Sequence, residues 1–148
     1  MSTQTPVDWA LLHQHAERAC QNAYAPYSRF TVGAALQTVD DQIFVGCNVE
    51  NASYGLTVCA ERNCIAAAIA QGVQGIKALV VFTPQKELTT PCGACRQVIA
   101  EFMAADAVIG LVNHLGETKQ WQVGDLLPAA FTPKTLAISN KNTTQTPY

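Results

Sequence analysis

Charged residues are scarce in this sequence. They make up 14% of its 148 residues, and the net charge at pH 7 is −2. Proteins that bind nucleic acid or an anionic membrane through electrostatics carry an excess of basic residues, and this composition offers none. A hydrophobic fraction of 49% argues against a disordered chain. The composition therefore predicts a compact protein with enough buried surface for an oligomer and a small molecule as its ligand.

Long hydrophobic runs and targeting signals are missing as well. The longest apolar run, from Cys64 to Ala70, is too short to cross a bilayer. The stretch from Met1 to Asp8 lacks the basic residues followed by an apolar run that define a signal peptide. No repeat, low-complexity segment or charged block divides the chain. We expect one cytoplasmic domain over residues 1–148, with its core in about residues 8–133 and a polar tail over 134–148.

The chain does contain alternating helix and strand patterns. The spacing of apolar residues predicts helices over residues 8–23, 60–71 and 92–103, and a short helical turn over 125–127. Runs of small, β-branched or continuously apolar residues predict strands over residues 31–38, 42–47, 77–83, 107–112 and 119–123. This alternation predicts an α/β fold with helices on both faces of a sheet.

Six cysteines are present, and three of them stand beside other chemically useful residues. Cys59 lies two residues before Glu61, while Cys92 and Cys95 follow Pro91 in a Pro-Cys-x-x-Cys pattern. In a cytosolic chain such thiols are metal ligands or core residues more often than disulfides. Zinc with three protein ligands keeps its fourth position for water and lowers the pKa of that water. A nearby carboxylate such as Glu61 can move protons between the water and a substrate nitrogen.

Helix geometry predicts where two of these residues lie. Cys59 and Cys92 both precede a predicted helix, where free N–H groups and partial positive charge favour thiolate over thiol. Residues i and i+2 of a regular helix do not share a face. Cys59 is therefore expected at the non-helical start of its helix, so that it and Glu61 can meet at one zinc ion.

Three interpretations of these cysteines remain open at this level. Cys92-Gly-Ala-Cys95 alone is similar to a dithiol redox motif, although no Trp precedes its first cysteine. A structural zinc site would need a fourth ligand, which Cys47 or Cys64 could supply. A catalytic zinc site is the interpretation that gives Glu61 a function.

Several segments together resemble the small homotetrameric zinc-dependent cytidine deaminases. The three cysteines and Glu61 match the all-cysteine form of the zinc nucleobase-deaminase signature. The matching segments occur in the family's order and are Tyr24 to Ala35, Gly46 to Tyr54, Cys59 to Arg62, Pro91 to Gln97, and Leu126 to Phe131. The likeness covers about residues 8–133 and departs from the family at Asn63-Cys64, where a pair such as Thr-Ala is more usual.

The resemblance implies a fold, a reaction and an assembly. The implied fold is a three-layer α/β/α sandwich around a mixed five-stranded sheet. The implied reaction is the zinc-dependent hydrolysis of cytidine and deoxycytidine to uridine and deoxyuridine, with release of ammonia, as in pyrimidine salvage. The partners implied are a small nucleoside and further copies of the chain in a homotetramer with shared active sites, without nucleic acid or membrane.

The resemblance also implies roles at the metal. Cys59, Cys92 and Cys95 would hold one Zn2+ per chain, and Glu61 would be the catalytic proton shuttle. Arg62 would hydrogen-bond the ligand sulfurs and offset the net negative charge that three thiolates leave on a dication.

The implied substrate-binding residues lie on both sides of the metal motif. Phe30 would pack beside the nucleoside, and Asn48 and Glu50 would hydrogen-bond the ribose hydroxyls. The backbone around Ala60 would contact the base or the reacting centre. Phe131 would reach into the site of a neighbouring subunit.

Other substrates fit these residues less well than cytidine does. A deaminase of blasticidin-type nucleoside antibiotics shares the cysteine and glutamate pattern, but we expect it to lack an arginine directly after the glutamate, so Arg62 favours cytidine. A polynucleotide editor would need basic and aromatic patches, and a nucleotide deaminase would need a cationic phosphate pocket. The sequence points to neither.

Overall fold

The computed structural model describes residues 5–136. Every helix and strand expected from the sequence is present. In chain order the elements are α1 (Trp9–Cys20), β1 (Gly33–Thr38), β2 (Ile43–Cys47), η1 (Tyr54–Leu56), α2 (Ala60–Ala70), β3 (Ile76–Thr83), α3 (Gly93–Phe102), β4 (Val108–Asn113), β5 (Thr118–Gln122), α4 (Val123–Leu126) and α5 (Pro133–Leu136). The short helices η1 and α5 were not predicted. Residues 137–148 of the predicted tail lie outside the described residues.

Side chains set two of the element boundaries. α1 begins after Asp8, whose carboxylate accepts a hydrogen bond from the N–H of Leu11 at 3.0 Å. β1 begins at Gly33 rather than at residue 31, because the side chain of Asn48 accepts the N–H of Val32 at 2.8 Å. Local side-chain bonds of this kind compete with the sheet ladder.

The sheet has five strands in the order β2-β1-β3-β4-β5. β1 is antiparallel to both β2 and β3, β3 is parallel to β4, and β5 is antiparallel to β4. The parallel pair requires a crossover connection, which α3 supplies. The expected mixed five-stranded sheet is therefore confirmed.

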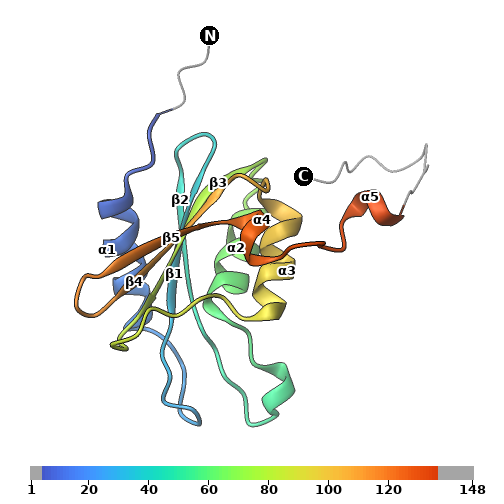
Figure 1. Cartoon of the computed structure of the whole chain (residues 1–148). Coiled ribbons are helices and arrows are strands. Elements are labelled where there is room, and N and C mark those ends of the chain that lie inside the picture. Colours follow the sequence, from blue (N-terminus) through green and yellow to red (C-terminus); the bar gives the residue numbers. More distant parts are fainter. Residues whose placement is uncertain (1–4, 137–148) are drawn as a thin grey trace.

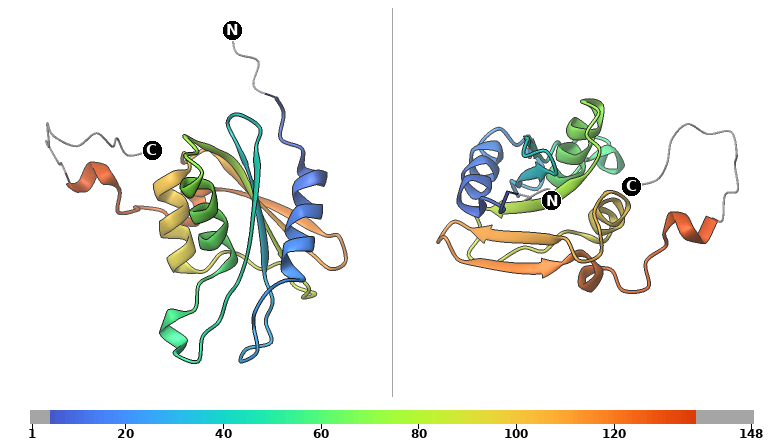
Figure 2. Two further views of the ribbon diagram at one scale, coloured as in Figure 1. Left: turned by 180° about the vertical axis from the view of Figure 1, so that it is seen from behind. Right: turned by 90° about the horizontal axis from the view of Figure 1, so that it is seen from above.

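Helices cover both faces of this sheet. α1 lies on one face, and α2 and α3 lie on the other (Figure 1, Figure 2). The strand residues alternate between the two sides, as the pleat requires. In β3, Leu79 and Val81 pack on the side of α2 and α3, whereas Ala78 and Val80 pack on the side of α1. The molecule thus has two cores separated by the sheet, an α2/α3-side core and an α1-side core, and the three-layer α/β/α prediction is confirmed.

The backbone of α2 approaches β2 closely at Gly46. A Cβ atom there would lie 2.4 Å from the nitrogen of Cys64 and 2.6 Å from the carbonyl oxygen of Ala60. No residue other than glycine fits without moving the helix. This close approach fixes the start of α2, and with it Cys59, relative to the loop that follows β2.

α2 and α3 begin at the same end of the sheet (Figure 1). Residues at the two helix starts can therefore meet, although the chain between them is long. Over residues 5–136, none of the helices combines the length and the apolar character needed to cross a bilayer.

Candidate active site

The three cysteines singled out in the sequence converge at the starts of α2 and α3. Cys59 is the N-cap of α2 and Cys92 is the N-cap of α3, both with extended backbone, and Cys95 lies in the first turn of α3. Their Sγ atoms all lie within 4.8 Å of one another. Cys59 therefore stands at the non-helical start expected for it, with Glu61 in the first turn of the same helix.

The spacing of these sulfurs fits a zinc ion. Tetrahedral zinc with Zn–S bonds of about 2.3 Å holds its sulfurs roughly 3.8 Å apart, and the Sγ atoms of Cys59 and Cys92 are 3.9 Å apart. Cys64 does not join this group, because its buried thiol bonds the carbonyl oxygen of Phe44 at 3.3 Å. Over residues 5–136 no fourth thiol joins the group, that of Cys47 included, so one position stays open, which is the arrangement of a catalytic zinc site.

The cluster is organised to carry thiolate. The pKa of Cys59 is lowered to about 5, first by its hydrogen bond with Cys95 and then by Arg62. The guanidinium Nη2 of Arg62 lies 3.3 Å from the Cys59 sulfur. The pKa of Cys95 is raised, because it shares a proton with Cys59 and is buried. Binding a metal would release this proton, since the ligand form of cysteine is the thiolate.

Glu61 lies beside the sulfurs in a dry environment. Its side chain is buried, with a relative exposure of 4%. Burial raises the pKa of its carboxyl, and the charge on Cys59 raises it further. A carboxyl group whose pKa is raised toward neutrality can both accept and donate a proton, which suits a general acid and base.

A second group of residues holds the loop around Phe30. The side chain of Asn48 donates to the carbonyl oxygen of Phe30 at 2.7 Å and accepts the N–H of Val32 at 2.8 Å. The carboxylate of Glu50 accepts the backbone N–H of Tyr27 at 2.9 Å and also bonds Ser28. Asn48 and Glu50 are thus both buried and both tied to the segment that carries Phe30.

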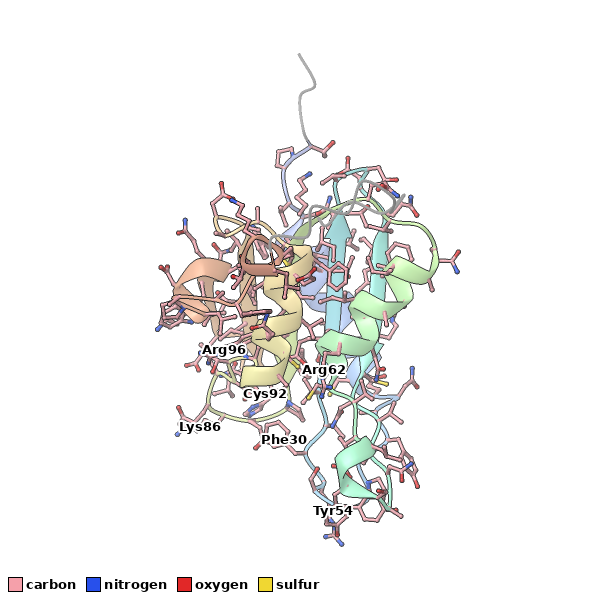
Figure 3. All side chains as sticks on the ribbon, turned by 90° about the vertical axis from the view of Figure 1, so that its right-hand side faces the viewer. Phe30, Tyr54, Arg62, Lys86, Cys92 and Arg96 are labelled. Carbon is pink, nitrogen blue, oxygen red and sulfur yellow. The ribbon has the colours of Figure 1, made fainter. Side chains whose placement is uncertain are left out.

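A hollow of about 250 Å³ adjoins this group, and Tyr27, Ser28, Glu50, Tyr54 and Thr57 line it. The rings of Tyr27 and Tyr54 pack with their centroids 5.5 Å apart. In the view of Figure 3, Tyr54 lies at the far tip of the molecule and Phe30 lies between it and Cys92. The side chain of Tyr54 is 74% exposed, so it lies at the surface beside this hollow and not in the core.

Phe131 stands apart from the other predicted site residues. Its side chain is 56% exposed, and its backbone oxygen accepts a hydrogen bond from Nε2 of Gln97 at 2.9 Å. The neighbouring Arg96 donates to the carbonyl oxygens of Pro91 at 2.7 Å and Leu126 at 3.1 Å. Helix α3 thus carries a metal-site cysteine and also anchors the segment that ends in Phe131.

Ser28 is a residue near the site that sequence reasoning did not single out. It bonds Glu50 directly, and no local pattern indicates this bond because the two residues are distant in the chain. Asn63 donates to the carbonyl oxygen of Cys47 at 2.9 Å, which links α2 to the end of β2. The sequence indicates this position by its departure from the family, where a pair such as Thr-Ala is more usual. Ala60 is fully buried at the first position of α2.

Comparison with known proteins gives one consistent result. Residues 8–111 match the family model of the cytidine and deoxycytidylate deaminase zinc-binding region. A cytidine deaminase from Halalkalibacterium halodurans is 46% identical over 126 residues, which are 85% of this chain and 96% of the relative. One from Sporosarcina psychrophila is 43% identical over 133 residues, covering 90% and 98%.

Solved structures agree with these sequence relatives. The crystal structure of a cytidine deaminase from Burkholderia pseudomallei superposes with a TM-score of 0.81 at 45% identity, covering 84% of this chain and 100% of the other. That of a cytidine deaminase from Mycobacterium tuberculosis superposes with a TM-score of 0.75 at 41% identity, covering 85% and 98%.

Proposed function

Because the chain belongs to the zinc-dependent cytidine deaminase family, its reaction is the hydrolysis of cytidine to uridine and ammonia, and we propose that Glu61 carries the protons of this reaction. One observation supports the proposal above all. Glu61 is buried in the first turn of α2, beside three thiols whose sulfurs lie within 4.8 Å of one another. Its carboxyl has a raised pKa because of that burial.

The proposed mechanism moves two protons through Glu61. Cys59, Cys92 and Cys95 would hold the zinc ion, which would lower the pKa of a water molecule so that hydroxide is available near neutral pH. Glu61 accepts the proton that this water gives up and delivers it to N3 of the cytosine ring as the C4–O bond forms. The proton of the new C4 hydroxyl then passes through Glu61 to the amino nitrogen. The C4–N4 bond breaks, ammonia leaves, and the proton on N3 stays in the uridine product.

The nucleoside is proposed to bind beside this centre. Phe30 packs against it, Asn48 and Glu50 hydrogen-bond the ribose hydroxyls, and the backbone at Ala60 contacts the base. The shared hydrogen bonds of Asn48 and Glu50 with the loop around Phe30 support a common site for the three side chains. Deoxycytidine is proposed as a second substrate.

The proposed assembly is a homotetramer in which Phe131 completes the site of a neighbouring subunit. Its high exposure, together with the anchoring of its backbone by Gln97, supports this role. The proposed location is the cytoplasm, because a three-thiolate metal site requires reduced cysteines. Arg62 is proposed to stabilise the thiolate of Cys59.

The test is ultraviolet absorbance of cytidine on addition of metal-analysed protein. We expect loss of the cytidine band with release of ammonia, about one zinc per chain, and loss of turnover when a chelator removes the metal and its return with added zinc. Zinc-loaded protein that turns over neither cytidine nor deoxycytidine would indicate another aminopyrimidine nucleoside. Metal-free protein with a reducible Cys92–Cys95 disulfide would indicate a redox function.

A further inference from the structure

Ser28 bonds both Glu50, a proposed ribose-binding residue, and Phe30, the aromatic residue proposed to pack beside the nucleoside. Its hydroxyl bonds an oxygen of the Glu50 carboxylate, and it accepts the backbone N–H of Phe30 at 3.0 Å. A serine hydroxyl has one donor and two acceptor positions. Since a carboxylate can only accept and an N–H can only donate, the direction of both bonds is fixed, and the two use the hydroxyl without conflict.

Three donors of this segment bond the carboxylate of Glu50, which leaves about one of its acceptor positions for a ligand. One oxygen accepts the N–H groups of Tyr27 at 2.9 Å and Ser28 at 3.2 Å, and the other bonds the Ser28 hydroxyl and, at 3.3 Å, its N–H. These bonds fix the plane of the carboxylate. The pKa of Glu50 is lowered, chiefly by the hydrogen bond with Ser28, so the group is an ionised acceptor on the wall of the hollow of about 250 Å³.

The backbone of Phe30 is fixed from the same side. Its N–H donates to Ser28, and its carbonyl oxygen accepts from Asn48 at 2.7 Å. Arg29, which lies between Ser28 and Phe30, has a left-handed φ of 57°. This conformation costs free energy in a residue with a Cβ atom, so it is kept only where the surrounding structure holds it. The hydroxyl of Ser28 therefore holds the backbone on both sides of Arg29, through its bond to Glu50 on one side and to the N–H of Phe30 on the other.

We propose that Ser28 is a positioning residue for nucleoside binding, whose hydroxyl orients Glu50 toward one ribose hydroxyl and at the same time fixes the backbone of Phe30. The proposal rests on the proposed ribose role of Glu50. Ser28 acts in the ground state and in the transition state alike, because the ribose is remote from the bond that breaks. Its loss therefore changes KM and leaves kcat nearly constant.

The test compares Ser28→Ala with Ser28→Thr on cytidine, 2′-deoxycytidine and 3′-deoxycytidine. In Ser28→Ala we expect KM for cytidine to rise about tenfold, the usual effect of losing a hydrogen bond to a charged group, with kcat within about twofold. Ser28→Thr restores KM, because threonine keeps the hydroxyl and the exposed position leaves room for its methyl group. The penalty becomes smaller with the analogue that lacks the hydroxyl from which Glu50 accepts a hydrogen bond, because only the effect on Phe30 remains.

Other results would overturn the inference in distinguishable ways. An equal rise of KM for all three nucleosides in Ser28→Ala would show a general loss of loop structure and refute the orienting role. If Glu50→Gln raises KM and Ser28→Ala does not, this inference alone is wrong. If Glu50→Gln leaves KM unchanged for every nucleoside, the proposed ribose role is wrong and the inference falls with it. Ser53→Ala is the matched control, because the Ser53 side chain makes no capping bond at η1, and it should leave KM unchanged.

Discussion

The guanidinium of Arg62 lies against the sulfur of Cys59, with Nη2 and Sγ 3.3 Å apart. Cys59 caps α2, and Arg62 follows within its first turn, so the pair lies on one face of the helix start. The positive charge helps to lower the pKa of the Cys59 thiol, and the thiolate in turn raises the pKa of Arg62. The ligand set therefore carries its own counter-charge.

Removing this counter-charge should weaken metal binding. In Arg62→Gln we expect zinc affinity to fall about 10- to 100-fold, as is typical for groups that support metal ligands. Competition with a chromophoric chelator measures this. Arg18→Gln, at the exposed end of α1, is the control and should bind zinc as the parent does. Equal affinity in Arg62→Gln would show that the guanidinium has no part in holding the metal.

Removing the proposed proton carrier should separate chemistry from metal binding. Glu61→Gln has nearly the same size but cannot accept and return a proton, so kcat should fall by about 10²- to 10⁴-fold while zinc content stays at the parent level. Steady-state absorbance and metal analysis of one sample give both values. Glu17→Gln, exposed on α1, should retain full activity. A Glu61→Gln protein with parental kcat would rule out the proton-carrier role.

The anchor of Phe131 should matter for the shared site. Gln97→Glu replaces the donor that bonds the Phe131 carbonyl oxygen with an acceptor, so the two oxygens repel. On dilution, we expect the variant to lose specific activity at a protein concentration about tenfold higher than the one at which the parent loses it, because its subunits would dissociate earlier. Sedimentation and activity across a dilution series measure this.

Two comparisons make the Gln97 experiment decisive. Phe131→Ala should lower activity at every concentration if the side chain completes a neighbouring site, and adding Gln97→Glu to it should have little further effect. Gln120→Glu, exposed on β5, should behave as the parent. Activity that is independent of dilution in all variants would argue against a shared site.

Acid should remove a part of the stability that Glu50 provides. Its folded-state pKa lies below the ordinary value of 4.5 because Ser28 and two backbone N–H groups bond the charged form. The stabilisation is therefore present above about pH 4.5 and is lost as the pH falls through the folded-state pKa. Urea unfolding of the parent and Glu50→Gln should show a difference in unfolding free energy at pH 7 that shrinks at low pH. A difference that grows with acidity would contradict this assignment.

The contact at Gly46 should not tolerate a side chain. Its added Cβ would meet the backbone of Cys64 and Ala60, so Gly46→Ala should lower the free energy of unfolding by about 1–3 kcal/mol, as overpacked sites do. Gly55→Ala is the control, because nothing lies within 4 Å of a Cβ atom there. Urea unfolding of both variants measures the difference. Equal stability would mean that α2 moves away from β2 at no cost.

Local patterns were enough to predict the elements of this fold. Periodicity predicted the helices and strands, and the cysteine spacing with Glu61 predicted which residues meet at the starts of α2 and α3. These features are encoded within short stretches, where helix capping and strand alternation act. The mixed character of the five-stranded sheet and the substrate-side roles were implied by the likeness to known deaminases, and the order of the strands is known only from the structure. None of these follows from local propensity.

Contacts between distant segments could not be predicted in the same way. Ser28 and Glu50 are joined only because β1 and β2 form a hairpin whose ends bring their loops together. The buried state of Asn48 also depends on the loop around Phe30. A polar loop sequence does not reveal which backbone groups elsewhere its side chains bond, so these contacts do not follow from the residues of either loop alone.

The separation of the two cores by the sheet has a consequence for engineering. The proposed metal and proton-transfer residues sit on the starts of α2 and α3, whereas α1 packs on the opposite face with its own core, formed by Leu12, Ala16, Cys20, Ala35, Ala78, Val80, Phe82 and Val112. Substitutions confined to the α1-side core would alter thermal tolerance without touching a metal ligand. A library of variants for a heat-resistant enzyme could therefore be built on that face, with the proposed metal and proton-transfer residues left unchanged.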